Sequence, residues 1–346
     1  MSLALLARIR GLATHAKAVW CNRSVRYLLL GGALSIAAIA IGTAIMVANF
    51  RDRALADSER ELKNTALILA GQIDRSFQSL ELFQVRIVEK LQSLGVASSE
   101  DYARHIASKD VHLMIKTSIS GMPHIAAITL IDADGNLMDT SRDGPIPTAN
   151  LADRDYFHAL KSDAQPTSFI SLPVRNRIND VWTLFLARKL THSNGEFLGV
   201  VLGAIELSHF EELFGSIEFG KGSSTALYRA DGYLLARFPR IEGAIGKPFK
   251  VALGALSGGV RGTARFIGQM EGKDRLLAAH RLAHFPLLVA VSRDADIVLA
   301  EWRNQTRLLL GVGGLAAIVV ASMILLIVRN LAEEQRLLTQ RLELKR

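Results

Sequence analysis

The chain has 346 residues, of which 49% are hydrophobic and 21% are charged, so it can bury a substantial core and is not a disordered polypeptide. Its 41 Lys and Arg exceed its 33 Asp and Glu, but the excess lies in short segments at the two ends, which argues against a nucleic-acid-binding face. The only cysteine, Cys21, lies in the basic N-terminal segment, which excludes an intrachain disulfide.

Two long uncharged segments lie near the ends of the chain. Residues 27–49 and 308–328 contain no Asp, Glu, Lys or Arg. At about 1.5 Å of rise per residue, each can cross a hydrocarbon layer of roughly 30 Å as a helix. A cleaved signal peptide is the alternative for the first segment, but its apolar region normally has only about 7–15 residues. We therefore expect two transmembrane helices.

Basic residues predict how these two spans are oriented. Residues 1–26 carry five basic residues and no acidic one, and residues 329–346 carry five basic residues and three acidic ones. Positively charged flanks remain on the cytoplasmic side of a membrane. The expected protein crosses the bacterial inner membrane twice, with both termini cytoplasmic and residues 50–307 in the periplasm.

The segment after the first span has the pattern of one long stalk helix. Residues 51–94 contain no proline and one glycine. Apolar residues recur at steps of seven, at Leu55, Leu62 and Leu69 and then at Ile73, Leu80, Ile87 and Leu94. Such a stripe suits pairing of two helices, whereas the alternative is a helix that packs on its own domain, above all near Phe77, Phe83 and Leu91.

Two further features complete the expected helical part. A second helix is predicted from Ser98 or Ser99 to Ser118 because these serines can cap it, and it belongs with the stalk to residues 50–122. Small residues recur at four-residue spacings in the spans and would allow close helix contact, which gives weak support for a homodimer. They are Gly31, Ser35, Ala38, Gly42, Gly313 and Ala317.

After Pro123 the pattern changes to strands. An Asp-Gly turn at residues 132–135 separates two apolar runs, which is a hairpin signal because glycine supplies the positive φ. The same pattern returns at residues 230–232, so one module is expected twice, at residues 123–217 and 218–305. Further strands are predicted at 182–191, 197–207, 276–282 and 287–292, and helices at 153–161, 208–217 and 293–307.

These elements predict an α+β fold of two tandem PAS-like modules with antiparallel sheets, on a long N-terminal stalk helix and flanked by two transmembrane helices. Their order, with the segments NLADRDYFHAL (150–160) and SFISLPVRNR (168–177), resembles the double-Cache sensor ectodomain that heads bacterial diguanylate cyclases and sensor histidine kinases. The resemblance covers roughly residues 50–305. Its most specific part is Asp-Arg-x-Tyr-Phe at 153–157, followed by the Ser-x-Pro-Val strand.

The resemblance implies a pocket in the membrane-distal module for a small organic carboxylate or an amino acid. Guanidinium groups bind carboxylates with two hydrogen bonds, and Tyr and Trp provide apolar walls with a polar tip. The alternative is that Arg154 pairs with Asp153 or Asp155 and that Phe157 belongs to the core. Carried onto this sequence, the implied ligand-binding residues are Arg154, Tyr156, Phe157, Arg175, Trp182 and Arg188.

Residues around this motif favour one ligand class. Amino-acid-binding relatives have Trp-Tyr after the arginine, whereas this chain has Tyr156-Phe157 and no clear acidic partner for an amino group. A simple organic acid is therefore favoured. No metal site is expected, because His280 and His284 lie near a strand and its turn, where four residues extend about 13 Å. No other cofactor and no catalytic centre is expected, because the sequence contains no catalytic motif.

The last 18 residues, 329–346, have the pattern of the start of a coiled-coil signalling helix, with Leu331, Leu338 and Leu342 on one side. The expected function is that of a receptor input unit, which passes a periplasmic signal to a cytoplasmic output domain or partner protein. One alternative is a diguanylate cyclase or histidine kinase whose catalytic domain lies outside this sequence. Another is a membrane adaptor whose ectodomain binds a periplasmic protein.

Overall fold

The computed structural model of the protein divides into two compact units, residues 58–297 with both β-sheets and a helical unit whose described residues are 23–57 and 298–343. The expected helix start at Ser98 or Ser99 and the lone Cys21 lie outside the described residues. The structure describes residues 23–343, except 94–100, 103–105, 107, 163–165, 193, 218–219, 250–253, 255–258 and 269–270.

The first sheet, which we call the distal sheet, has the strand order β2-β1-β6-β5-β3, with β4 paired to β5. All its pairings are antiparallel. Its helix α4 begins after Ser108, whose hydroxyl accepts a hydrogen bond from the amide of Val111 and so caps the helix. The elements are α4 (Lys109–Ser118), β1 (Ala127–Asp132), β2 (Leu137–Thr140), α5 (Asp155–Lys161), β3 (Ser168–Ile170), β4 (Val174–Arg175), β5 (Trp182–Thr191) and β6 (Phe197–Glu206).

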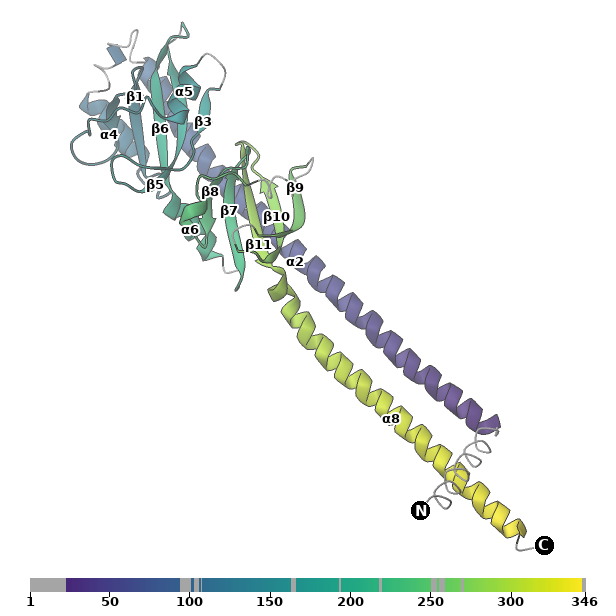
Figure 1. Cartoon of the computed structure of the whole chain (residues 1–346). Coiled ribbons are helices and arrows are strands. Elements are labelled where there is room, and N and C mark those ends of the chain that lie inside the picture. The colour runs from purple at the N-terminus through teal and green to yellow at the C-terminus, as the bar shows by residue number, and fades with distance from the viewer. Residues whose placement is uncertain are drawn as a thin grey trace. The chain divides into compact units, whose positions relative to one another are not determined.

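The second sheet, which we call the proximal sheet, has the strand order β8-β7-β11-β10-β9 and is also antiparallel throughout. Helix α6 connects the two sheets along the chain (Figure 1). The elements are α6 (Leu207–Ser216), β7 (Ser223–Arg229), β8 (Leu234–Phe238), the short 3-10 helix η1 (Glu242–Ala244), β9 (Arg261–Ile267), β10 (Asp274–Arg281) and β11 (Leu287–Asp294).

The predicted α+β fold with two antiparallel sheets is confirmed, and each sheet contains the expected Asp-Gly hairpin. Gly135 has φ 88° and Gly232 has φ 94°, a region that glycine adopts without strain. At Gly135 a side chain would also collide with Ala152, since a Cβ atom there would lie 2.6 Å from its backbone nitrogen. The hairpin glycine thus also lets the segment before α5 approach the turn.

Helix α2 (Arg23–Ser93) supplies one long buried stripe to the sheet unit. Figure 1 shows its ribbon passing behind both sheets. Against the distal sheet, the buried amide of Gln84 donates hydrogen bonds to the carbonyl oxygens of Leu186 on β5 (2.7 Å) and Val201 on β6 (2.9 Å). Its fully buried apolar residues, each at most 2% exposed, are Leu62, Ala66, Leu69, Ala70, Ile73, Phe77, Leu80, Ile87 and Leu91.

The seven-residue stripe was predicted to suit pairing with a second helix, and for most of its length this prediction is wrong. Leu62, Leu69, Ile73, Leu80 and Ile87 are buried within this chain. The apolar face of a helix is buried against an apolar surface, and the sheets of the same chain form that surface for this part of α2. The alternative reading, a helix packed on its own domain, describes this part of α2.

Strand β9 was not predicted. It lies at the edge of the proximal sheet, and none of its seven residues is fully buried. An edge strand with both faces partly open to solvent needs no alternation of apolar and polar residues, so the sequence carries little signal for it.

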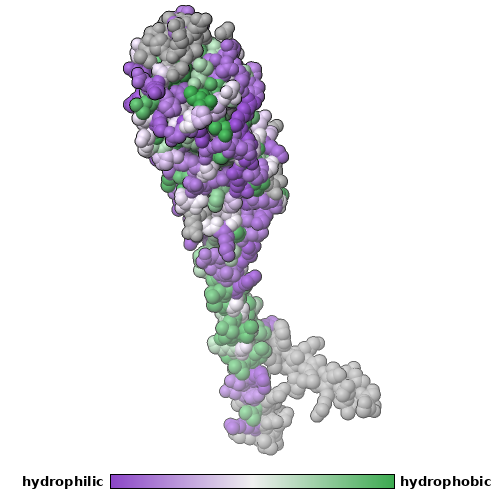
Figure 2. Space-filling view, turned by 90° about the vertical axis from the view of Figure 1, so that its left-hand side faces the viewer, coloured by the Kyte–Doolittle hydropathy of each residue, from purple (hydrophilic) through white to green (hydrophobic). Residues whose placement is uncertain are grey.

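The helical unit contains the two helices that are long and apolar enough to span a membrane, judged by length and composition. They are the first part of α2 and the helix α8 (Ala295–Glu343). On the face shown in Figure 2, hydrophobic side chains cover the paired helices, while the surface of the sheet unit is mainly hydrophilic. Such a surface fits a lipid environment.

Small residues allow the two apolar helices of this unit to approach each other within one chain. A Cβ atom at Gly32 would lie 1.9 Å from Ile324, and one at Gly313 would lie 2.9 Å from the hydroxyl of Thr43. The indole of Trp302 also donates a hydrogen bond to the Val47 carbonyl oxygen (2.9 Å). Close packing through glycine is typical of helices in membranes, and at Gly313 it serves an intrachain contact.

The first testable prediction concerns the contact between α2 and the distal sheet. A Cβ atom at Gly203 on β6 would lie 2.4 Å from a methyl carbon of the fully buried Leu80. We expect Gly203→Ala to lower the free energy of unfolding by about 1–3 kcal/mol, because overpacking strains a dense core. Thermal unfolding of the full chain in lipid nanodiscs, followed by circular dichroism, measures this.

The matched control is Gly71→Ala on α2, where a Cβ atom would make only an ordinary contact of 3.6 Å with Arg75. Alanine at a helix position should stabilise by about 0.5–1 kcal/mol. Truncating Leu80 to alanine should relieve the strain at position 203, so the double variant should be more stable than the sum of the two single changes implies. Additive costs would show that these side chains do not meet.

Candidate ligand-binding site

The distal sheet has two faces with different neighbours. Successive residues of a strand point to opposite faces. Gly203 faces Leu80 of α2, so its neighbours Leu202 and Ala204 face the other way, into an apolar cluster with Tyr156 and Phe157 of α5. The face opposite α2 is therefore covered by α5.

A small cavity of about 20 Å³ lies on this face. This volume holds roughly one water molecule, so a larger ligand can enter only if the lining side chains move. The strands β1, β5 and β6 form its floor, and the segment before α5 and the turn between β4 and β5 form its cover. Its polar lining consists of Thr129, Arg142, Arg154, Tyr156, Asn176 and Arg177.

Three arginines give this cavity its charge. Arg142 lies 3.6 Å from Glu206, Arg177 is hydrogen-bonded to Asp153 at 2.6 Å, and Arg154 is the N-cap residue of α5. None of the described residues that line the cavity is acidic. The site is therefore suited to a carboxylate and offers no lining carboxylate to an amino group.

Several polar atoms around this cavity are buried without a hydrogen-bond partner among the described residues. They are the hydroxyl of Tyr156 and the Nε and Nη2 atoms of Arg142, of which Nη2 lies 3.6 Å from the Glu206 carboxylate. Burial raises the pKa of the Tyr156 hydroxyl far above its usual value, so this group stays protonated and can donate. A buried donor without an acceptor is costly, and an anion in the cavity would satisfy these donors.

Arg177 joins the two segments that cover the cavity by hydrogen bonds. It extends from the turn after β4 and donates hydrogen bonds to the carbonyl oxygen of Asn150 and to the carboxylate of Asp153. The hydrogen bond from Arg177 holds the pKa of Asp153 below its ordinary value. Entry of a molecule larger than water requires this cover to open, and the contacts of Arg177 must then break or rearrange.

The structure brings two of the six predicted residues, Arg154 and Tyr156, to the cavity. Phe157 packs in the core with its ring 5.8 Å from that of Phe197, and Arg188 donates a hydrogen bond to Glu81 on α2 (3.0 Å). Neither of these side chains lines the cavity.

The remaining two predicted residues, Arg175 and Trp182, contact each other outside the cavity. The Arg175 guanidinium is 5.0 Å from the Trp182 ring centroid, and the Trp182 indole donates to Glu242 of the proximal module (3.1 Å). The alternative for Arg154 was an ion pair with Asp153 or Asp155; the carboxylate of Asp153 is paired with Arg177 at 2.6 Å.

Sequence reasoning missed Arg142 and Arg177. Arg177 stands two residues after Arg175 within the segment that carries the family resemblance. Strand β4 ends at Arg175, and the chain then turns around Asp180, whose φ is 54°. That turn directs the later arginine to the cavity, and no strand periodicity could reveal it. Arg142 follows β2 with no surrounding motif.

A long helix along two PAS-like antiparallel sheets, with an arginine-lined cavity in the first sheet, defines a sensor domain of the tandem-module class. The family model with the description "Cache domain" (dCache_1) matches residues 47–302. The chain therefore belongs to the Cache family, as the resemblance predicted. No curated protein matches the chain in sequence.

Solved structures of sensor domains are similar to the chain. The extracellular domain of rpHK1S-Z16, described as a histidine kinase, is 26% identical, covers 72% of this chain and 99% of its own, and has a TM-score of 0.61. The periplasmic sensory domain of the Campylobacter jejuni chemoreceptor Tlp1 is 16% identical (71% and 98% covered, TM-score 0.56). The ligand-binding domain of the Pseudomonas aeruginosa PAO1 amino acid chemoreceptor PctB, in complex with L-Arg, is 18% identical (71% and 98%, TM-score 0.54). The last two show the fold alone.

The second testable prediction concerns the buried hydroxyl of Tyr156. We expect Tyr156→Phe to raise the free energy of unfolding of the ligand-free protein by about 1 kcal/mol, because it removes a buried donor that has no acceptor. The same change should weaken binding of a carboxylate about tenfold. Chemical denaturation and calorimetry of the full chain in nanodiscs measure the two effects.

Tyr102→Phe is the matched control, since the hydroxyl of the buried Tyr102 donates to the Ile131 carbonyl oxygen at 3.4 Å. Its loss should destabilise the protein. If Tyr156→Phe destabilised the ligand-free protein as much as Tyr102→Phe does, the Tyr156 hydroxyl would have an acceptor and the argument for a donor aimed into the cavity would fail.

Proposed function

We propose that the chain is the input unit of a transmembrane receptor, which binds a small organic carboxylate in the cavity of the distal module. The observation that supports this most directly is the set of buried donors without acceptors, Tyr156 and Arg142, next to Arg154 and Arg177. Such donors are costly unless an anion or water meets them. A carboxylate can accept several of these hydrogen bonds at once.

An amino acid is the second candidate ligand, and the comparisons favour it. The chemoreceptors CtaA of Pseudomonas fluorescens and PctB of Pseudomonas aeruginosa PAO1 were solved with L-isoleucine and L-Arg. In this chain, however, none of the described lining residues is acidic. An ammonium group in the cavity would lie near three guanidinium groups and would find no carboxylate in the lining. The lining therefore favours an acid without an amino group.

The proposed signal travels from the cavity to the two helices that continue into the spans. The cavity floor includes β5 and β6, and these strands are hydrogen-bonded to Gln84 of α2 on their other face. Helices α2 and α8 each run unbroken from the sheet unit into an apolar segment. A ligand that favours one arrangement of β5 and β6 would bias the position of α2.

The small volume of the cavity bears on the choice between a metabolite and a periplasmic protein as ligand. A closed cavity would suit an adaptor that binds a protein on its surface, but this cavity is lined by charged donors rather than by apolar groups alone. The matched solved structures are sensor or ligand-binding domains, which supports an input role. The output domain or partner protein, and a homodimer, belong to the proposal as well.

The third testable prediction separates the two ligand classes by matched pairs: succinate against aspartate, propionate against alanine, and isovalerate against valine. Each pair differs only in the amino group. We expect the full chain in nanodiscs to bind at least one acid more tightly than its amino-acid partner in calorimetry. Tighter binding of the amino acid in every pair would overturn the preference for simple acids.

Variants of two arginines test the location of this site. Arg154→Ala should weaken binding of the best ligand about 10- to 100-fold, because it removes a charge-assisted contact. Arg175→Ala is the matched control, since Arg175 is 51% exposed and donates to the Asp180 carbonyl oxygen outside the cavity, and it should leave the affinity unchanged. Equal losses in both variants would contradict a site at Arg154.

The fourth testable prediction concerns membrane topology. The expected orientation places Cys21 in the cytoplasm, so a membrane-impermeant maleimide should not label the wild-type chain in intact bacterial spheroplasts and should label it after lysis. With Cys21 replaced by serine, a single cysteine at the exposed Ser208 should be labelled in intact spheroplasts. The opposite pattern would refute a periplasmic sheet unit.

A further inference from the structure

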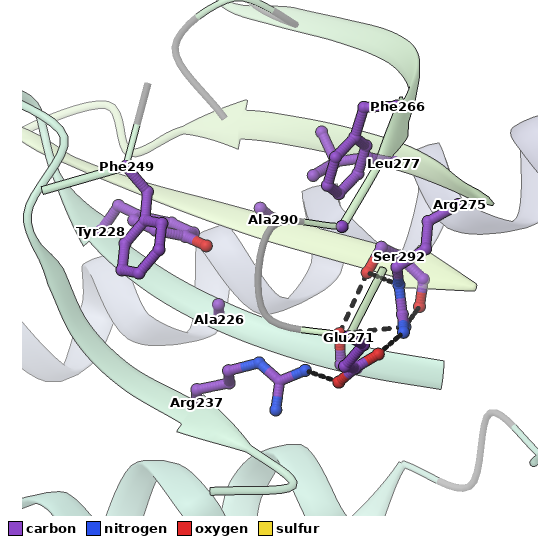
Figure 3. A pocket seen from close by; sticks show the side chains of 12 residues that line it. Ala226, Tyr228, Arg237, Phe249, Phe266, Glu271, Arg275, Leu277, Ala290 and Ser292 are labelled. Atoms are coloured by element: carbon purple, nitrogen blue, oxygen red, sulfur yellow. Dashed lines mark hydrogen bonds and ion pairs between the residues drawn. The ribbon is translucent and has the colours of Figure 1, made fainter. Parts of the chain in front are cut away.

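The proximal module contains a cavity of its own. It has a volume of about 60 Å³, which corresponds to roughly four water-sized groups. Figure 3 shows its lining side chains on one face of the proximal sheet, with Tyr228 and Phe249 on one side of the cavity and Arg275 on the other. This cavity is separate from the one in the distal module, and no described residue lines both.

Small side chains hollow out this face of the sheet. Ala226 on β7 and Ala290 on β11 are directly paired, and so are Ser224 and Ser292. All four line the cavity. Paired residues on adjacent strands point to the same face of the sheet. Larger side chains at these four positions would therefore fill the cavity.

Aromatic and aliphatic side chains form much of the wall of the cavity. Tyr228, Phe249, Phe266 and Leu277 line it, and Phe266 is the direct cross-strand partner of Arg275. Burial raises the pKa of Tyr228 to about 12, so its hydroxyl is uncharged at neutral pH. This part of the cavity suits an alkyl chain and disfavours a second charge.

Two buried arginines form the polar end. Arg237 on β8 is 6% exposed and Arg275 on β10 is 4% exposed. The carboxylate of Glu271 lies between them: Arg237 donates to one oxygen at 2.6 Å, and Arg275 donates to the other. Glu271 comes from the connection between β9 and β10, and its side chain is 30% exposed. A carboxylate from a surface loop thus occupies the position between two guanidinium groups.

The two arginines depend on this carboxylate to different degrees. Arg275 also pairs with the buried Asp294 at 2.7 Å and donates to Ser292 and to the Gly222 carbonyl oxygen. Within the described part of the chain, Glu271 is the one acidic partner of Arg237. Arg237 also donates a hydrogen bond to the carbonyl oxygen of Pro239. If Glu271 turned outward, Arg237 would be a buried charge without a counter-ion, which is strongly unfavourable.

We propose that the proximal cavity is a second ligand site, specific for short-chain aliphatic monocarboxylates of two to four carbons. The carboxylate of the ligand takes the place of the Glu271 carboxylate between Arg237 and Arg275, and its alkyl chain lies against the aromatic wall. Glu271 moves outward into solvent, which it already partly faces. The exchange keeps the charge of the site unchanged, because one carboxylate replaces another.

The position of this site connects it to the closing helix. Asp294, which pairs with Arg275, is the last residue of β11, and α8 begins at the next residue. Lys273, two residues after Glu271, donates to the same Asp294 carboxylate (3.1 Å). Outward movement of Glu271 would therefore change the contacts of Arg275 and Lys273 with Asp294, the residue directly before α8.

The fifth testable prediction uses the full chain in nanodiscs with Arg154→Ala as the background, so that binding in the distal cavity is weakened in every chain that is compared. Calorimetry with propionate is the assay, and succinate and ethylammonium are the comparison compounds. Glu271→Gln should bind propionate about tenfold more tightly than the background chain, because the competing internal carboxylate is gone. Glu196→Gln, in the exposed turn between β5 and β6, is the matched control and should leave the affinity unchanged.

A second variant blocks the cavity without touching its charges. Ala226→Leu should abolish propionate binding in a chain whose thermal unfolding shows that it is folded. The proposal is overturned if Glu271→Gln binds propionate no more tightly than its parent, or if folded Ala226→Leu binds it equally well. Binding of succinate as tight as that of propionate would also overturn it. Failure of the distal site would leave these results unchanged, since every chain in the series already lacks Arg154.

Discussion

The structure depends above all on the packing of α2 against both sheets. One helix contributes a buried stripe from Leu62 to Leu91 to the sheet unit, so the two modules share part of their core instead of burying two separate ones. The contacts are specific as well as apolar: Gln84 is bonded to carbonyl oxygens of β5 and β6, and Gly203 leaves room for Leu80. A strand that shifts in the distal sheet must therefore move this helix or lose those bonds.

Because α2 covers one face of the distal sheet, only the opposite face is left for a cavity there. The distal cavity is lined by three arginines, of which Arg142 has buried nitrogen atoms without a hydrogen bond, whereas the proximal cavity holds two arginines that one internal carboxylate bridges. The two modules thus share a fold but differ in how they balance buried positive charge. This difference, rather than the fold, separates their expected ligands.

The sequence was sufficient to predict elements whose side chains alternate or whose turns need glycine. The bounds of β5 match the predicted residues 182–191, and the two Asp-Gly hairpins are present. It was insufficient for β9, an edge strand without buried residues, and for the seven-residue stripe of α2, because periodicity identifies an apolar face but not the surface that covers it. Among the site residues, Arg154 and Tyr156 line the cavity, while the role of Arg177 depends on a turn that no local pattern specifies.

The carboxylate of Asp155 in the distal module makes two kinds of contact, one within its own module and one with the proximal module. Asp155 starts α5 beside the cavity and accepts a hydrogen bond from the Leu172 amide, and it also lies 3.9 Å from Arg229 at the end of β7, whose guanidinium donates to the Ile170 carbonyl oxygen. The helix that covers the distal cavity is therefore held near the neighbouring module by an electrostatic interaction. An asparagine at this position could keep the local hydrogen bonds but would carry no charge toward Arg229, so evolutionary drift here is constrained by two neighbourhoods at once.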